Sequence, residues 1–178
     1  MTSADIAEAL LASLGEDLGL EDLAFDEQGR ILLTIDEQQL VTLALDAEDP
    51  DALYLFSAIV PVSPETPGLL WRALKANYLW EGTAGATLAV EPEAGVLVAH
   101  RRLALPGLTY PDFHQAVRLF AELTAVWGEA GNRAAGDDTP GDDTAGGDTA
   151  GGDTAGDDAE QAPGDAAAEL TRNFNHLA

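Results

Sequence analysis

The stretch from Gly128 to Gly164 limits where this chain can fold. It consists almost entirely of Gly, Ala, Asp, Thr and Pro, and it contains no aromatic or branched aliphatic residue. Such a composition buries too little apolar surface to offset the conformational entropy that is lost on ordering. The sequence therefore predicts one folded domain over residues 1–128, a disordered linker over 129–164 and a short helix over 165–178.

A degenerate five-residue repeat fills much of this linker. Four copies begin at Thr139, Thr144, Thr149 and Thr154, and each ends in Asp. An EF-hand loop needs ligands at alternating positions and a closing Glu, and a calcium β-roll needs a large apolar residue in every repeat. The repeat has neither pattern. We interpret it as a solvated, charged spacer without a metal site.

The charge is strongly negative in both parts of the chain. The net charge is −24, of which residues 1–128 (20 acidic, 6 basic) carry −14 and residues 129–178 (12 acidic, 2 basic) carry −10. Such a surface repels phosphate backbones and anionic lipid, which argues against nucleic-acid or membrane binding. The chain has no cysteine, its first residues lack the basic and apolar regions of a signal peptide, and no apolar run is long enough to span a bilayer. We expect a soluble cytoplasmic protein.

Three segments have the apolar spacing of amphipathic helices. The first begins at Thr2 or Ser3 and ends at Gly15 or Gly19. The second covers roughly Glu65–Trp80. The third begins at Thr109, and it carries an apolar stripe formed by Phe113, Val117, Phe120, Leu123 (or Thr124) and Trp127.

Between these helices the apolar residues follow strand patterns. Strand material begins at Leu23–Phe25, and short turns separate the strands that follow. Adjacent strands joined by short turns form antiparallel sheets, so the sequence predicts an α+β fold with a twisted antiparallel sheet and three helices. The predicted strands are Arg30–Ile35, Leu40–Leu45, Ala52–Val60, Thr87–Val90 and Val96–Leu105.

No group of residues has the spacing of a catalytic or metal site. His100, His114 and His176 lie on a strand, a helix and the tail, without the close spacing of metal ligands. No Ser lies in a G-x-S-x-G elbow, and no glycine run forms a nucleotide-binding loop. Glu91 and Glu93 flank a turn proline, where solvent would keep their carboxylates in their ordinary ionised state. We therefore expect no enzyme activity and no cofactor; an enzyme that uses other carboxylates is the remaining alternative.

The domain has more large apolar residues than one small core can hold. Strand alternation and helix spacing place seven of them on the side of a strand or helix opposite the side that faces the core. There they are candidates for a partner or dimer interface. The alternative is that a twisted sheet buries several of them under its helices. The seven are Leu32, Leu40, Tyr54, Phe56, Trp71, Leu79 and Trp80.

Five motifs follow one another in the second half of the domain. They are a leucine-rich helix ending in Ala-Asn, a glycine before a strand, a Pro-Glu-x-Gly turn, an Arg-Leu-x-Leu strand, and a last helix with a phenylalanine and a terminal tryptophan. In this order they resemble the class I type III secretion chaperones, the Tir chaperone family. The resemblance covers about residues 3–128 and is looser before the second helix. The motifs fall on Leu69–Asn77, Gly82–Val90, Pro92–Gly95, Arg102–Leu105 and Phe113–Trp127.

The resemblance implies an α-β-β-β-α-β-β-α protomer that forms a homodimer. It also implies a function: an ATP-independent chaperone that binds the N-terminal segment of a type III secreted effector in extended form and keeps it soluble and export-competent. The implied dimer interface is Leu70, Leu74, Tyr78, Leu88 and Val90. The implied effector-binding residues are Ile6, Leu10, Leu32, Leu33, Ile35, Val41 and Leu43.

Two interpretations outside this function stay open at the level of the sequence. One is a regulatory or sensory α+β domain of similar fold that binds a folded partner and has no role in export. The other concerns the tail. Leu170, Phe174 and Leu177 fall on one face of the expected short helix, and they could occupy the protein's own client groove.

Overall fold

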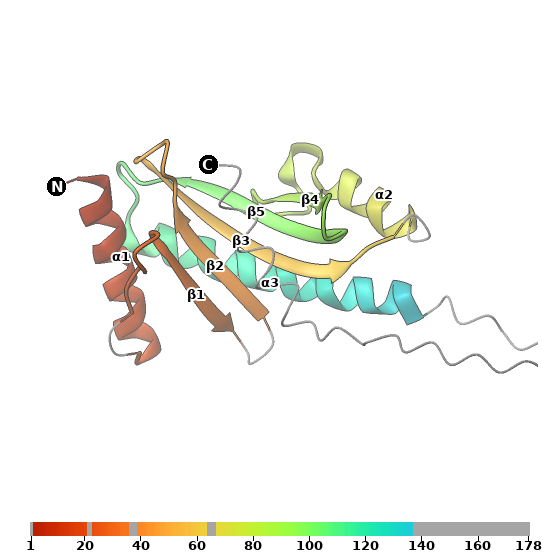
Figure 1. The fold of residues 1–178 in the computed structure, drawn as a ribbon, viewed down its shortest axis with the longest axis horizontal. Helices are drawn as coiled ribbons and strands as arrows, with labels where there is room; N and C mark the ends of the chain where they lie inside the picture. Colours follow the sequence, from red (N-terminus) through yellow and green to blue (C-terminus); the bar gives the residue numbers. More distant parts are fainter. Residues whose placement is uncertain (1, 21–22, 36–38, 64–66, 137–178) are drawn as a thin grey trace, which may run out of the picture.

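The computed structural model describes residues 2–20, 23–35, 39–63 and 67–136. Its order of helices and strands confirms the predicted α-β-β-β-α-β-β-α protomer (Figure 1). The linker over 137–164 and the short helix over 165–178 lie outside the described residues. The elements are α1 (Ser3–Leu18), β1 (Arg30–Ile35), β2 (Gln39–Leu45), β3 (Ala52–Pro61), α2 (Pro67–Ala76), the 3₁₀ turn η1 (Tyr78–Trp80), β4 (Thr87–Glu91), β5 (Val96–Ala104) and α3 (Tyr110–Gly136).

The five strands form one antiparallel sheet in the order β1-β2-β3-β5-β4. Residues Leu23–Phe25 were predicted to begin the sheet, but they belong to no strand. Instead Leu23 and Phe25 are partly buried against the core, with the Cβ of Leu23 against Gly15 of α1. Packing against a helix has replaced strand pairing there.

The ends of the helices follow the local signals in the sequence. Thr2 and Asp5 form a capping box in which the Thr2 N–H donates to the Asp5 carboxylate (2.6 Å) and the Asp5 N–H donates to the Thr2 hydroxyl (3.2 Å). The bond from the Thr2 N–H, with a smaller contribution from the Thr2 side chain, lowers the pKa of the Asp5 carboxyl. Gly19 ends α1 with a left-handed φ of 66°, which costs glycine little. Thr109 caps α3 by accepting from the Asp112 N–H.

Helix α3 is longer than predicted. It runs to Gly136, eight residues past the boundary placed at 128, so the first part of the expected linker is helical. Ala130 and Gly131 are buried, and a Cβ added to Gly131 would lie 2.4 Å from Cγ2 of Val60 on β3. The small residues that suggested a linker thus allow the helix and the sheet to approach closely.

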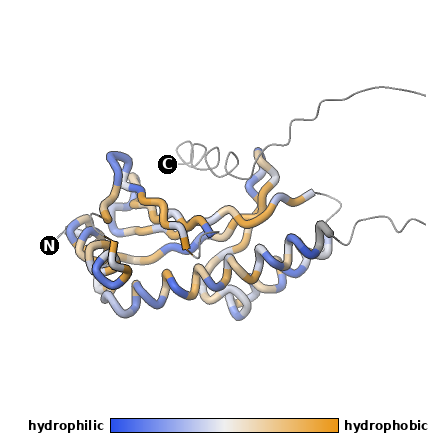
Figure 2. Tube along the Cα trace, turned by 90° about the horizontal axis from the view of Figure 1, so that it is seen from below, coloured by the Kyte–Doolittle hydropathy of each residue, from blue (hydrophilic) through white to orange (hydrophobic). Residues whose placement is uncertain are grey.

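The helices leave the two faces of the sheet in different environments. The inner sheet face packs on α3, which runs along one side of the sheet (Figure 2). No helix in the described ranges covers the opposite, outer sheet face. The inner sheet face consists of Leu33, Val41, Leu43, Leu53, Leu55, Leu97 and Ala99, all buried together with Phe113 and Phe120 of α3.

Candidate partner-binding surfaces

Large apolar side chains gather at α2, η1 and the neighbouring strand β4, and we call this group the α2 surface. Their exposed fractions run from 43% to 70%, which is high for tryptophan, tyrosine and leucine. An exposed cluster of this kind marks an interaction site in a soluble protein. The α2 surface consists of Trp71, Leu74, Tyr78, Leu79, Trp80 and Val90.

The packing of α2 explains why these side chains face outward. Leu69 and Ala73 are the buried residues of the helix. The Arg72 guanidinium lies 5.7 Å from the centre of the Trp127 ring of α3, a cation–π contact that fixes the rotation of α2. With Leu69 and Ala73 buried and Arg72 beside α3, Trp71 and Leu74 lie on the side away from the core.

The backbone of η1 holds its apolar side chains in a strained conformation. Leu79 and Trp80 have φ values of 52° and 56°, in the left-handed region that disfavours residues with a Cβ. Backbone hydrogen bonds hold the turn, from the Trp80 N–H to the Asn77 carbonyl (3.1 Å) and from the Thr83 N–H to the Trp80 carbonyl (3.2 Å). Strain of this kind persists where surrounding structure imposes it, and it clusters at functional sites.

Asn77 closes the free edge of the sheet at β4. Its side-chain amide donates to the Leu88 carbonyl (2.8 Å), and its side-chain oxygen accepts from the Leu88 N–H (2.9 Å). Strand β4 pairs with β5 on its other side, so the Leu88 groups that Asn77 takes are those that point out of the sheet. An incoming strand cannot pair with Leu88 while Asn77 holds it.

Among the described residues, no strand pairs with the outer edge of β1. Asp26 takes the outward groups of Arg30: its N–H donates to the Arg30 carbonyl (2.7 Å) and its carboxylate accepts from the Arg30 N–H (2.8 Å). Backbone groups of an antiparallel strand point alternately toward and away from the partner strand. Leu32 and Thr34, which share the parity of Arg30, therefore also point their N–H and C=O groups away from β2.

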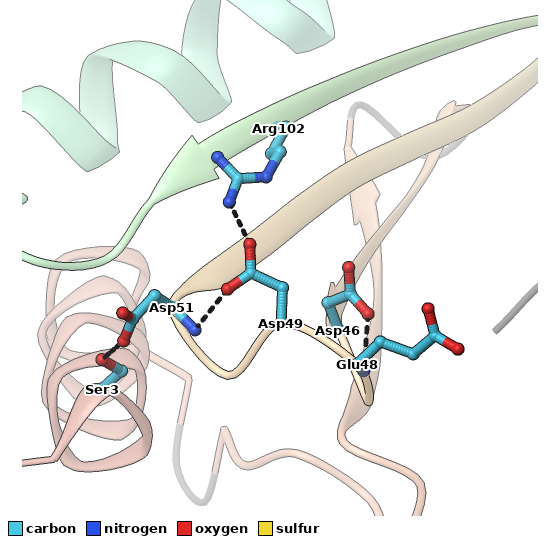
Figure 3. Close-up of polar contacts among 6 residues, drawn as sticks. All are labelled: Ser3, Asp46, Glu48, Asp49, Asp51 and Arg102. Carbon is cyan, nitrogen blue, oxygen red and sulfur yellow. Dashed lines mark hydrogen bonds and ion pairs between the residues drawn. The ribbon is translucent and has the colours of Figure 1, made fainter.

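The acidic turn between β2 and β3 is bound within the protomer (Figure 3). The Asp49 carboxylate accepts from the Arg102 guanidinium and from the Asp51 N–H (3.1 Å), and these bonds lower the pKa of Asp49 and raise that of Arg102. The Ser3 hydroxyl donates to Asp51 and so ties α1 to this turn. Within the described part of the chain, no group of three or more His, Cys, Asp and Glu residues is placed to hold a metal ion.

The neighbouring residues of strand β5 point to opposite faces. His100 lies on the outer sheet face opposite Phe56, and its partial burial lowers the pKa of the imidazole. Arg101 lies on the other side against Gly85, and partial burial lowers the pKa of its guanidinium. The Arg101-Arg102 pair therefore does not form a single basic patch. His114 lies beside Tyr110 on α3, with ring centres 5.9 Å apart, and His176 is outside the described residues.

A family model for the Tir chaperone protein (CesT) family matches residues 9–127, about two thirds of the chain. The chain belongs to this family. None of the curated proteins with which the chain was compared matches it. Among its described residues, no helix has the length and apolar character needed to cross a membrane.

Solved structures that resemble this member of the family share its fold. One, described as the HopA1–SchA chaperone–effector complex, is 24% identical with a TM-score of 0.58, and the match covers 70% of this chain and 94% of the other. The ExsC–ExsE complex gives 23% identity and a TM-score of 0.63, with 74% and 97% covered. The Yersinia pestis type III secretion chaperone SycH, in complex with a YscM2 fragment, gives 18% identity and 0.55, with 67% and 98% covered. The predicted fold class and family are confirmed.

The structure places the predicted dimer residues mainly on the α2 surface. Leu74, Tyr78 and Val90 are exposed, and Leu70 is half-buried. Leu88 is buried inside the protomer, where it supports that surface from below. Trp71, Leu79 and Trp80 were recognised in the sequence only as excess apolar residues, and the structure now brings them together with the predicted set.

The predicted effector-binding residues lie mostly inside the protomer. Only Leu32 is well exposed, at 56%. Alternation along β1 and β2 turns four others toward the core, and the remaining two lie on α1. Leu10, Leu33, Val41 and Leu43 belong to the core, and Ile6 and Ile35 are partly buried against it.

Proposed function

We propose that this protein is a homodimeric chaperone that holds the N-terminal segment of a type III secreted effector in extended form and keeps it soluble and competent for export. The observation that carries this proposal is the family match over residues 9–127. Resemblance to a chain whose structure is described as a chaperone–effector complex supports it. Binding alone would protect such a client, so the chaperone would need no nucleotide, no cofactor and no catalytic step. It would act in the bacterial cytoplasm.

In this proposal the α2 surface is the homodimer interface. Clustered tryptophan, tyrosine and leucine are the residues that dominate the affinity of protein–protein interfaces. A twofold axis would bring the same surface of each copy together, so that Leu74, Tyr78 and Val90 are covered twice. Asn77 and the strained η1 would hold these side chains ready before the copies meet, which reduces the entropy lost on association.

The client is assigned to the opposite edge of the sheet. An extended peptide gains affinity when its main chain pairs with an exposed strand and its side chains enter shallow pockets. At β1 the backbone groups of Leu32 and Thr34 point outward, and the Leu32 side chain is exposed beside them. The buried members of the predicted effector-binding set, such as Leu33, Val41 and Leu43, would form the floor of this region.

Co-expression with the products of neighbouring genes, followed by size exclusion and mass spectrometry, tests the function. We expect two copies of this chain with one extended client. A folded partner recovered in place of an extended segment would support the regulatory alternative, and a monomer that binds nothing would contradict the proposal.

A substitution on β1 tests the location of the client. Thr34→Pro removes an outward N–H without removing a bond to β2, a position where a sheet edge tolerates proline. We expect client affinity to fall at least about tenfold, the loss of one to two hydrogen bonds, while the thermal unfolding midpoint changes little. Thr34→Ala, which keeps the N–H, is the matched control. Equal affinities for the two variants would exclude main-chain pairing at this edge.

A further inference from the structure

The outer sheet face carries an apolar surface that is separate from the α2 surface. The pairing of the strands places Leu32, Thr42, Phe56, His100 and Thr87 in one row across all five strands. In the adjoining region, Val96 and Val98 pack with Phe56, Ala58 and Ala89 as a second small cluster. No helix of the described residues lies over this face (Figure 2). On this face Leu32 is well exposed, at 56%, whereas Val96 and Val98 are buried.

The sequence after α3 offers a segment with matching chemistry. Residues 137–164 contain no aromatic, leucine, isoleucine or valine, whereas Leu170, Phe174 and Leu177 follow at the i, i+4, i+7 spacing of one helix face. Between 165 and 178 two acids and one arginine nearly balance, while 137–164 has nine acids and no Lys or Arg. The segment 165–178 is thus nearly neutral and amphipathic, and charge does not oppose its contact with an apolar face.

The geometry allows this segment to reach the outer sheet face of its own chain. Gly131 of α3 contacts Val60 near the end of β3, so the linker begins beside that end of the sheet. Phe56 lies four residues before Val60, which is roughly 13 Å along the strand. A polar linker of 28 residues has a typical end-to-end distance of roughly 30 Å. Tethering at this distance raises the local concentration of the segment into the millimolar range, so modest contacts suffice.

We propose that residues 165–178 bind the outer sheet face of the same chain, with Leu170, Phe174 and Leu177 against Phe56 and its apolar neighbours. A second copy of the chain is the less suitable occupant, because the α2 surface already provides an interface with exposed tryptophans. The bound segment would cover the row from Phe56 to Leu32, beside the outer edge of β1.

Spin labelling of the full chain tests the contact. The chain has no cysteine, so Asn175→Cys provides one attachment site, on the side of the expected helix away from the three apolar residues. We expect strong paramagnetic broadening of the methyl signals of Leu32, Leu40 and Val98, and none at Leu74 or Val90. Adding Leu170→Ser, Phe174→Ser and Leu177→Ser should abolish the broadening, whereas Arg172→Ala, on the same side as the label, should preserve it.

Three results would overturn the proposal. The first is weak broadening spread evenly over the domain, and the second is broadening centred on the α2 surface. The third is broadening that appears only when spin-labelled chains are mixed with isotope-labelled chains, which would show contact between copies. None of these measurements uses a client, so the result stands whether or not the proposed function is correct.

If the proposed function is correct, binding of residues 165–178 would also regulate the affinity for the client. If the segment covers the face in nine of ten molecules and competes with client, the apparent client affinity is reduced about tenfold. We therefore expect Phe174→Ser to tighten client binding about five- to tenfold, with Asn175→Ala as the control. Unchanged affinity would mean that segment and client bind side by side, and it would contradict the competition.

Discussion

Leu43 and Leu74 show how differently the structure treats the apolar residues of this chain. Leu43, on the inner sheet face, is 0% exposed beneath α3, whereas Leu74, on the α2 surface, is 64% exposed. The sequence marked both as members of binding surfaces. The difference comes from what lies above each residue within the protomer: a 27-residue helix in one case and no described element in the other.

Apolar side chains of these two regions contribute to two different processes, folding of the protomer and association with a partner. The inner sheet face supplies the free energy of folding, since its leucines leave water when the protomer forms. The α2 surface is in contact with water in the protomer, so in the proposed homodimer its contribution would belong to assembly. Substitutions in the two regions should therefore affect different measurements.

The largest expected effect on folding is at the inner sheet face. Leu43→Ala should lower the free energy of unfolding by about 2–5 kcal/mol, because it removes buried methyl groups and leaves a cavity. Urea unfolding measures it. Leu32→Ala, on the outer sheet face, should cost less than about 0.5 kcal/mol. Similar losses for both variants would show that the two positions do not differ in burial.

On the α2 surface we expect the effect to appear in assembly. Leu74→Asp should weaken self-association at least about a hundredfold, because burial of a leucine contributes about 1.5–3 kcal/mol and a twofold interface contains it twice. Sedimentation measures the dissociation constant. Val126→Asp, at a similarly exposed position on α3 (59%), is the control. If the Val126 variant dissociates instead, the interface lies on α3.

A smaller effect, on the free energy of unfolding, is expected from a substitution at Asn77, where the α2 surface joins the sheet. Asn77→Ala removes both bonds to Leu88, and we expect a loss of about 2 kcal/mol in the free energy of unfolding. The freed edge of β4 should also promote aggregation, which light scattering measures. Asn132→Ala, at an exposed position on α3, is the control. A stable, monodisperse Asn77 variant would show that this closure of the edge is dispensable.

The smallest expected effect is on the pH dependence of the free energy of unfolding, and it comes from His100 on the outer sheet face. Burial lowers the pKa of His100 below its usual 6.5, so the unfolded chain takes up a proton before the folded chain does. The free energy of unfolding should therefore fall as pH drops below 6.5 and be independent of His100 above it. Tyr54 and Arg102 are the titratable groups in the neighbouring row.

His100→Gln should flatten this part of the pH profile, as measured by urea unfolding at a series of pH values. His114→Gln should leave it in place. The lowered pKa values of Asp5 and Asp49 act only at lower pH, since their ordinary value is 3.8. A profile that is unchanged by His100→Gln would show that this histidine is well solvated in the folded protein.

Local signals were sufficient to predict most of the fold from the sequence. Strand β1 was predicted with the observed bounds, and the stripe from Phe113 to Trp127 is the buried side of α3. The end of α3 could not be predicted, because Gly131 resembles a linker residue until Val60 is seen 2.4 Å from where its Cβ would be. In the sequence alone, a glycine that packs closely against another element cannot be told from a glycine that ends a helix.

The surfaces were harder to predict, for a related reason. Period-two alternation shows that Leu32 and Leu33 point to opposite faces, but it does not say which face a helix covers. The structure buries Leu33 and exposes Leu32. It also packs α2 beside β4 and ties Asn77 to Leu88, so that the exposed tryptophans lie on elements next to the strand that carries Val90.

The sequence by itself therefore determined the elements, their antiparallel arrangement and the family, because these depend on periodicity, capping and the order of motifs along the chain. Only the tertiary structure decided which apolar residues are core and which are surface. That outcome depends on where three helices lie over a two-sided sheet, and contacts between residues far apart in the chain set those positions.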